Sequence, residues 1–177
     1  MIHYINGNLL NSNCNFICHQ VNCQGKMGSG VAKQIRDRWP EVYTNYIFKC
    51  DQAMAVEKED PMTTKEDYLL GSVQILYIEE ANIPYQCVVN MFAQAFYGYN
   101  GNRYTSYDAF WSCLNELKNQ IPKNSTIAFP YNVGCGLGGA NWNVIVTMID
   151  TVLKDYDVYI YRLEPWYENL GSKEIKK

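Results

Sequence analysis

Residues 19–43 read HQVNCQGKMGSGVAKQIRDRWPEVY, and this stretch decides how the chain folds. It begins inside a nearly continuous apolar run, Phe16 to Asn22, which is typical of a strand buried on both faces. Glycines follow at positions 25, 28 and 30. Val31, Ile35 and Trp39 then recur at helical spacing until Pro40, which ends or bends a helix. The stretch therefore predicts a buried strand, a glycine-rich loop and an amphipathic helix.

A second stretch of the same kind lies nearer the end of the chain. Thr126 to Phe129 predicts a strand, residues 134–139 read GCGLGG, and Asn141 is placed to cap a following helix. The buried face of that helix is expected to consist of Val144, Met148 and Val152. Since both glycine loops follow a strand and precede a helix, they should share one rim of a parallel sheet.

The remaining apolar patterns predict four more strands and one more helix. The strands are expected at Ile2–Ile5, 71–78, 86–92 and 158–163. Thr105 with Asp108 resembles a capping box at the start of the helix. The apolar stripe of this helix consists of Tyr107, Phe110, Leu114, Leu117 and Ile121.

The order of these elements predicts one layered α/β domain over residues 1–165 with a mostly parallel sheet. Val42 to Lys49 continues the first helix beyond Pro40. The charged segment from Cys50 to Tyr68 is expected to be a surface loop. Residues 166–177 are expected to form a polar tail.

Composition excludes several functional classes. The net charge is −3 and no basic stripe is visible, which argues against a nucleic-acid partner, although 15 tyrosines could stack on single-stranded bases. Seven cysteines without a Cys-x-x-Cys pair, and only two histidines, argue against a metal site. With no leader and no long apolar run, we expect a cytoplasmic protein that has free thiols and no membrane partner.

The glycine-rich loops carry the chemistry that the sequence predicts. Glycine lets the backbone approach a ligand closely, and the unpaired N–H groups of a following helix attract an anion such as phosphate. Each loop alone could be only a tight turn. Two such loops on one rim favour a diphosphate. Neither loop is a Walker loop, and Gly25, Gly28 and Gly30 have the wrong spacing for a dinucleotide fingerprint.

The stretch 19–43 resembles the first loop and helix of macro domains, in the branch of small bacterial and phage proteins that process ADP-ribose-1″-phosphate. Residues 7–10 (GNLL) and 131–139 (YNVGCGLGG) match its other motifs. The resemblance implies a three-layer α/β/α sandwich with a mixed, mostly parallel sheet and ADP-ribose lying across the rim. By this resemblance, Asn8 and Leu9 lie near the adenine and Asn22 near the distal ribose. The diphosphate is held by Gly28, Ser29, Gly30 and Val31 on one side and by Gly134, Cys135, Gly136, Leu137 and Gly138 on the other.

The chain departs from the related macro domains that remove ADP-ribose from proteins with a lysine and an aspartate. Gln94 stands at the lysine position, and Gly138 or Asn141 at the aspartate position. Amide side chains cannot act as a nucleophilic amine or a general base, so that mechanism is not expected here. His19 could instead protonate a leaving oxygen or orient water, or it could be a structural histidine bonded to a carbonyl.

Two functions remain open from the sequence. The first is a slow hydrolase that converts ADP-ribose-1″-phosphate to ADP-ribose and phosphate, with His19 and Asn22 as the catalytic pair and no cofactor. The second is a non-catalytic module that senses or sequesters ADP-ribose or a nucleotide derived from NAD. Either would act as a monomer. The cysteines in the two loops, Cys23 and Cys135, are expected to pack rather than react.

Overall fold

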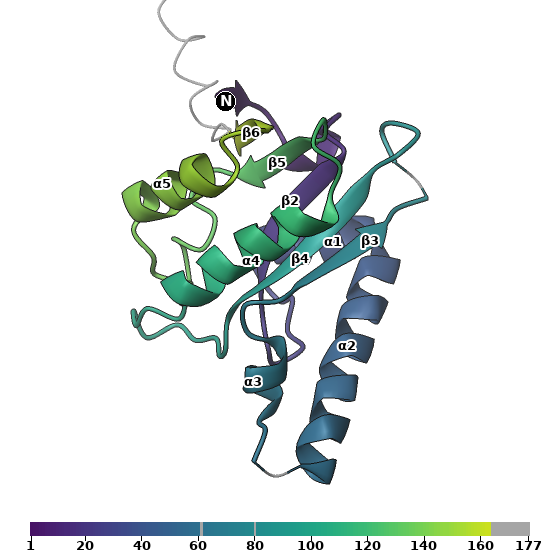
Figure 1. The fold of residues 1–177 in the computed structure, drawn as a ribbon, viewed down its shortest axis with the longest axis vertical. Coiled ribbons are helices and arrows are strands. Elements are labelled where there is room, and N and C mark those ends of the chain that lie inside the picture. The colour runs from purple at the N-terminus through teal and green to yellow at the C-terminus, as the bar shows by residue number, and fades with distance from the viewer. Residues whose placement is uncertain (61, 80, 164–177) are drawn as a thin grey trace, which may run out of the picture.

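A computed structural model describes residues 1–60, 62–79 and 81–163 and shows a six-stranded sheet covered by helices on both faces (Figure 1). The sheet order is β1-β6-β5-β2-β4-β3, and only the edge strand β3 runs antiparallel to its neighbour. This arrangement confirms the predicted mixed, mostly parallel sheet. The strands are β1 (Ile2–Asn6), β2 (Phe16–Asn22), β3 (Val73–Tyr77), β4 (Cys87–Gln94), β5 (Thr126–Pro130) and β6 (Asp157–Arg162).

The helices form the two outer layers of the predicted α/β/α sandwich. Helices α4 and α5 cover one face of the sheet, and α1, α2 and α3 lie on the other (Figure 1). The helices are α1 (Gly30–Arg38), α2 (Pro40–Glu59), α3 (Lys65–Leu69), α4 (Tyr107–Gln120) and α5 (Trp142–Val152), with a short 3₁₀ helix, η1 (Leu9–Asn11). No helix in the described ranges is long and apolar enough to span a membrane.

Pro40 separates the first two helices, as the sequence predicts. Helix α1 ends at Arg38, and Trp39 leaves the helical conformation with φ −131° and ψ 81°. Pro40 is then the first residue of α2, where its missing N–H costs no helical hydrogen bond. The Trp39 ring is buried with Ile35 of α1 and Val42 of α2, so both helices pack against the residue that separates them.

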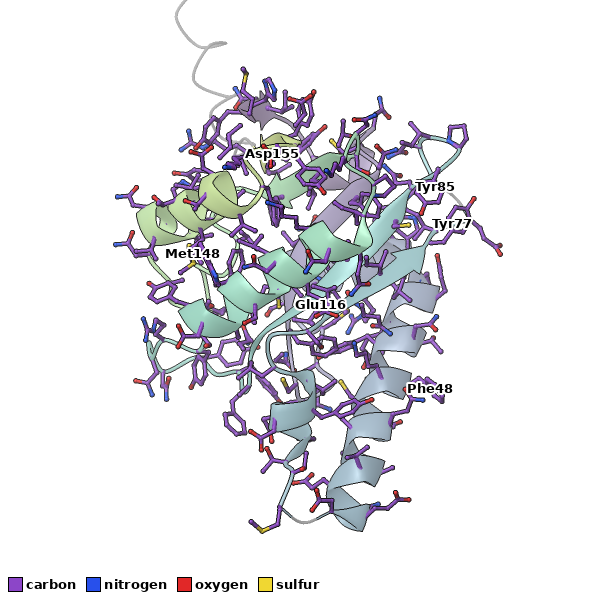
Figure 2. All side chains as sticks on the ribbon, viewed as in Figure 1. Phe48, Tyr77, Tyr85, Glu116, Met148 and Asp155 are labelled. Atoms are coloured by element: carbon purple, nitrogen blue, oxygen red, sulfur yellow. The ribbon has the colours of Figure 1, made fainter. Side chains whose placement is uncertain are left out.

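The expectation of a loop from Cys50 to Tyr68 is wrong. Helix α2 continues to Glu59, and α3 forms part of the remainder. Cys50 and Ala53 extend the buried stripe of Val42 and Tyr46 at helical spacing, while Phe48 points away from the sheet on the outer side of α2 (Figure 2). Asp51, Lys58 and Glu59 lie on the exposed side of α2, whereas Lys65 and Glu66 of α3 are mostly covered and contact the Gln24 side chain.

Two local predictions also need correction. Ser106, and not Thr105, caps α4, because its side chain accepts a hydrogen bond from the Ala109 N–H. Asn141 caps α5 as predicted, but the buried face of α5 consists of Ile145, Ile149 and Val152. Val144 is exposed and Met148 is half-buried, because α5 carries two neighbouring apolar stripes at the same spacing and the one that contains Ile145 and Ile149 faces the core.

Three buried clusters hold the layers together. The largest lies between the sheet and helices α4 and α5. Two smaller clusters lie on the opposite face, one beneath α1 and the start of α2, the other beneath the rest of α2 and α3. The tail predicted at residues 166–177 lies outside the described residues.

Candidate functional site

A cavity of about 550 Å³ lies beyond the carboxyl end of the central strand β2, and both glycine-rich loops line it. A second hollow of about 520 Å³ adjoins the first. The two share Val31 from α1 and a short segment, residues 130–132, at the carboxyl end of β5. The predicted common rim is therefore present, and it carries two connected hollows.

The structure distributes the predicted site residues between these hollows. Asn8 and Leu9 line the second hollow, where the Asn8 side chain caps η1. Cys135 lines neither hollow: its thiol lies 3.3 Å from the Val133 carbonyl oxygen, and its side chain packs on the large core cluster. The main cavity is lined by His19, Asn22, Gly28, Ser29, Gly30, Val31, Gly134, Gly136, Leu137 and Gly138.

The first loop ends at a helix terminus that has no side-chain cap. Ser29 occupies the cap position of α1 but makes no capping hydrogen bond with its hydroxyl. The first helical bond runs from the Lys33 N–H to the Ser29 carbonyl. The N–H groups of Gly30, Val31 and Ala32 therefore have no helical partner, and these residues line the cavity.

The second loop offers N–H groups of its own and not those of a helix terminus. Asn141 already caps α5 by accepting from the Asn143 N–H. Within the described ranges, the N–H groups of Gly136, Leu137 and Gly138 have no backbone or side-chain acceptor. The prediction that both loops use a helix N-terminus thus holds for the first loop only.

Asn22 organises the first loop. Its amide oxygen accepts hydrogen bonds from the Gln24 N–H at 2.9 Å and the Lys26 N–H at 3.3 Å, and its amide nitrogen donates to the Lys26 carbonyl at 2.7 Å. The hydroxyl of buried Tyr46 donates to the Asn22 carbonyl at 2.6 Å and accepts from the Lys26 N–H at 3.1 Å. The amide of Asn22 keeps one unassigned N–H hydrogen for a ligand.

A second polar network fixes the other loop against the sheet. The Gln20 amide nitrogen donates to the Gln94 amide oxygen at 2.6 Å and to the Thr105 hydroxyl at 2.7 Å. The Thr105 hydroxyl donates to the Gly134 carbonyl at 2.8 Å, and the Gly138 carbonyl accepts from the backbone N–H of Thr105 at 2.9 Å. Both glycines approach these side chains so closely that a Cβ atom would overlap with them.

His19 lies on β2 between the two smaller apolar clusters and is 1% exposed. Its Nε2 atom lies 2.6 Å from the amide oxygen of Asn90 on β4. Burial lowers the pKa of the imidazole to about 4, although the Asn90 contact opposes this shift. His19 is therefore neutral near pH 7. Since its proton is committed to Asn90, protonation of a leaving oxygen is not a role that this geometry supports.

The charges around the main cavity favour an anionic ligand. Lys26 and Arg36 line it, and no Asp or Glu among the described residues does. Gln94 lines the cavity and is held by Gln20. The thiol of Cys23 is buried, and burial raises its pKa to about 12, which confirms packing as its role.

Sequence reasoning missed the residues that hold the loops in place. Gln20, Tyr46, Asn90 and Thr105 all contribute side-chain hydrogen bonds to the site, and none was assigned to it. The signal for Asn90 was present, since an amide interrupts an otherwise apolar strand pattern. Thr105 gave no usable signal, because a threonine just before a helix is more often a cap.

Fold and site together define a class of protein: a three-layer α/β/α domain with two glycine-rich loops that face one cavity at the carboxyl ends of its strands. Comparison with known proteins identifies the class. The chain belongs to the macro domain family, whose model matches residues 18–149.

Two curated relatives resemble the chain to different extents. An uncharacterized 17.5 kDa protein from the tk-vs intergenic region of Enterobacteria phage T4 is 29% identical over 171 residues, 93% of this chain and 98% of the relative. The DNA ADP-ribosyl glycohydrolase of Mycobacterium tuberculosis is 42% identical over 50 residues, which is 28% of this chain and 14% of that enzyme.

Solved structures support the same fold. The macrodomain of Mycobacterium tuberculosis DarG superposes with a TM-score of 0.70 at 22% identity, covering 91% of this chain and 97% of that one. Thermosipho africanus DarTG in complex with ADP-ribose superposes with a TM-score of 0.68 at 20% identity, covering 94% of this chain and 42% of that one. At these identities the likeness establishes the macrodomain fold.

Proposed function

We propose that this protein binds ADP-ribose across the two connected hollows and hydrolyses a phosphate from its 1″ position. The observation that carries the proposal is the pair of glycine-rich loops, whose unpartnered N–H groups line one cavity that has two cationic and no acidic side chains among its described lining residues. Two sets of free N–H groups on one rim suit a diphosphate.

The remaining parts of ADP-ribose follow from the position of the loops. The adenine lies in the second hollow beside Asn8 and Leu9, because this hollow contains neither glycine loop. The distal ribose then reaches the end of the main cavity where His19 and Asn22 lie at the carboxyl half of β2. Val31 and residues 130–132, which line both hollows, flank the junction between the two halves.

Two comparisons support an ADP-ribose ligand. A structural neighbour was solved in complex with ADP-ribose, and a relative that matches a 50-residue stretch is a DNA ADP-ribosyl glycohydrolase. Both findings support a chain that binds ADP-ribose and hydrolyses a bond to it. Phosphate as the released group rests on the resemblance of residues 7–10, 19–43 and 131–139 to the branch of small bacterial and phage proteins.

Catalysis in this site depends on positioning and backbone hydrogen bonds. No carboxylate among the described residues lines the cavity, and neutral His19 carries its proton towards Asn90. The site holds the distal ribose in place and binds the diphosphate through backbone N–H groups. The ring nitrogen of His19 that does not face Asn90 can accept a hydrogen bond and orient a water molecule. We expect slow turnover.

A specific observation favours a second function, a binding module without turnover. By the sequence resemblance, Gln94 stands where related macro domains that remove ADP-ribose from proteins have a lysine, and its side chain is engaged with Gln20 and with the Phe96 carbonyl. All parts that bind ADP-ribose are retained in such a module. It would sense or sequester ADP-ribose or a related nucleotide.

The two functions separate in a pair of measurements. Calorimetric titration should show that ADP-ribose binds more tightly than AMP or NAD, because only ADP-ribose offers a diphosphate with a free distal ribose. Phosphate release from ADP-ribose-1″-phosphate, and release of ADP-ribose from an ADP-ribosylated oligonucleotide, then test turnover. Equal affinity for AMP would contradict the two-loop site. Tight binding without either reaction would establish the binding module.

A further inference from the structure

Two buried side-chain polar atoms have no hydrogen-bond partner in the described part of the chain, and they belong to adjacent residues. They are His19 Nδ1 and Gln20 Oε1. Both residues line the main cavity. Buried polar atoms are nearly always paired, so each exception calls for an explanation. The identity of the missing partner depends on whether each atom donates or accepts.

A chain of hydrogen bonds fixes the protonation of His19. The chain ends at the Asn45 carbonyl on α2, which can only accept, so the amide nitrogen of Gln74 donates to it at 3.0 Å. The Gln74 amide oxygen then faces Asn90 and accepts from the Asn90 amide nitrogen at 3.0 Å. The Asn90 oxygen is left facing His19 Nε2, which must carry the proton.

The register of the sheet sets up this chain. His19 pairs with Asn90 across β2 and β4, and Asn90 pairs with Gln74 across β4 and β3. The three side chains therefore lie in one row on the α1–α2 face, between two apolar clusters. A row of polar side chains within an apolar layer costs free energy unless its buried polar atoms are hydrogen-bonded. In this row, Nδ1 of His19 is the one buried atom without a hydrogen-bond partner.

The same reasoning fixes Gln20 independently. The Thr105 hydroxyl donates its only hydrogen to the Gly134 carbonyl, so it must accept from Gln20. The amide nitrogen of Gln20 therefore faces Thr105, and the unpartnered atom is the carbonyl oxygen. A second chain anchored on a backbone carbonyl thus leaves a second acceptor at the cavity.

We infer that Asn90 and Gln74 are positioning residues that hold His19 as its Nε2–H tautomer, and that His19 Nδ1 and Gln20 Oε1 are acceptors, closed off from the cavity in this structure, that a small movement of the surrounding side chains offers to a hydroxyl group of a ligand or water. Anionic phosphate oxygens carry no hydrogen to give and would be repelled by such acceptors. The cavity therefore separates two chemistries: N–H groups on its loops for phosphate, and acceptors at the end of β2 for hydroxyl groups. The hydroxyl donor is either a sugar hydroxyl or an ordered water.

The tautomer can be measured without any ligand. The chain has two histidines, so His3→Gln leaves His19 as the only imidazole for ¹⁵N NMR. We expect a bare Nδ1, a protonated Nε2 and a slowly exchanging Nε2–H proton between about pH 6 and pH 8. Protonation at Nδ1 in the folded protein would overturn the inference.

Asn90 offers a matched pair of variants in the same background. Asn90→Asp keeps an acceptor beside Nε2 and adds a negative charge, so the Nε2–H signal should persist and the histidine should titrate at clearly higher pH. Asn90→Leu removes the acceptor, so the protected Nε2–H signal should be lost while circular dichroism confirms folding. If the Asp variant left the titration of His19 unchanged, Asn90 would not position it. Should Asn90→Leu fail to fold, Gln74→Leu on the half-buried edge strand is expected to populate the second tautomer, because the Asn90 amide could then turn.

A ligand experiment identifies the hydroxyl donor, and this part rests on the proposed function. ADP-ribose and ADP differ by the distal ribose, so the ratio of their affinities reports contacts to that sugar. If the sugar supplies the hydroxyl, His19→Phe should lower the ratio by about 2- to 13-fold, the value of one hydrogen bond. If water supplies it, the ratio should hold while phosphate release falls. No change in either would overturn the acceptor role, whereas failure of the wild type to bind ADP-ribose would overturn the proposed function and leave the tautomer result intact.

Discussion

Lowering the pH should destabilise this protein through His19 in a way that one substitution can isolate. The imidazole is fully buried, its pKa in the folded state is lowered to about 4, and an unfolded histidine titrates near 6.5. The unfolded chain therefore takes up a proton first as the pH falls. The stability that depends on the neutral ring is complete above about pH 6.5 and is lost as the pH falls towards 4.

The magnitude follows from the two pKa values. At about pH 5 the unfolded state gains about 30-fold in its partition function from this proton and the folded state gains almost nothing, a difference of about 2 kcal/mol. At about pH 4 the difference reaches about 3 kcal/mol. A domain of this size has only about 5–15 kcal/mol of stability in total, so the effect is large enough to measure.

His19→Gln is the informative variant, because glutamine keeps an N–H for Asn90 and cannot titrate. Urea unfolding followed by tryptophan fluorescence at a series of pH values gives the free energy of unfolding for both proteins. The difference between wild type and variant should change by about 2 kcal/mol from about pH 7.5 to pH 5. His3→Gln, on the edge strand β1, is the control for loss of the other histidine, and it should keep the fall in stability that His19 causes as the pH drops from about 6.5 towards 4. Parallel curves for wild type and His19→Gln would refute the argument, since the remaining carboxylates titrate equally in both.

Four further predictions concern the loops and the thiols. Gly138→Ala should lower the unfolding free energy by about 1–3 kcal/mol, because its Cβ would overlap with the Gly134 carbonyl oxygen and the Thr105 hydroxyl; Gly136→Ala, whose Cβ meets nothing within 4 Å, should change the melting temperature little. Gly28→Glu should abolish calorimetric binding of ADP-ribose in a folded protein, whereas Gly28→Ala should retain it, because Cβ has open space there and only the carboxylate opposes the diphosphate. Tyr46→Phe should cost about 1–3 kcal/mol in thermal unfolding and weaken ADP-ribose binding, since the lost hydroxyl bridges Asn22 and Lys26; full affinity in this variant would show that the first loop does not need this bridge. Mass spectrometry after alkylation near pH 8 should find Cys135 modified before Cys23. Cys135 is half-exposed, whereas Cys23 is buried and burial raises the pKa of its thiol to about 12. Faster labelling of Cys23 would mean that the first loop opens.

The sequence was sufficient for the order of the six strands and of α1, α4 and α5, and the reason is physical. Each strand is an apolar run bounded by turn residues, and each predicted strand agrees with the structure to within two residues at either end. The helical continuation beyond Lys49 was missed because the segment from Cys50 to Tyr68 is rich in charged residues and its apolar residues are mostly small. Only Cys50 and Ala53 mark its buried face, and both are small.

Prediction of the site was less complete. Both glycine loops could be located, because glycine spacing between a strand and a helix is a local pattern. The networks that hold the loops are not local: Gln20 meets Thr105, and His19 meets Asn90, across separations of 85 and 71 residues. Nothing in the sequence around His19 indicates which ring nitrogen carries the proton, since that depends on a carbonyl of α2 two strands away.

The contact of Thr105 with the second loop links three segments that are far apart along the chain. Residues 20–32, 94–105 and 130–138 meet only when β2, β4 and β5 are already paired. Closing such long loops costs entropy that local structure cannot repay, so the cavity should be among the last parts to form during folding. A ligand held between these segments would bind the folded state alone. A bound molecule would therefore hold the three segments together, and once the cavity is saturated the unfolding free energy of the domain would rise with the logarithm of the ligand concentration.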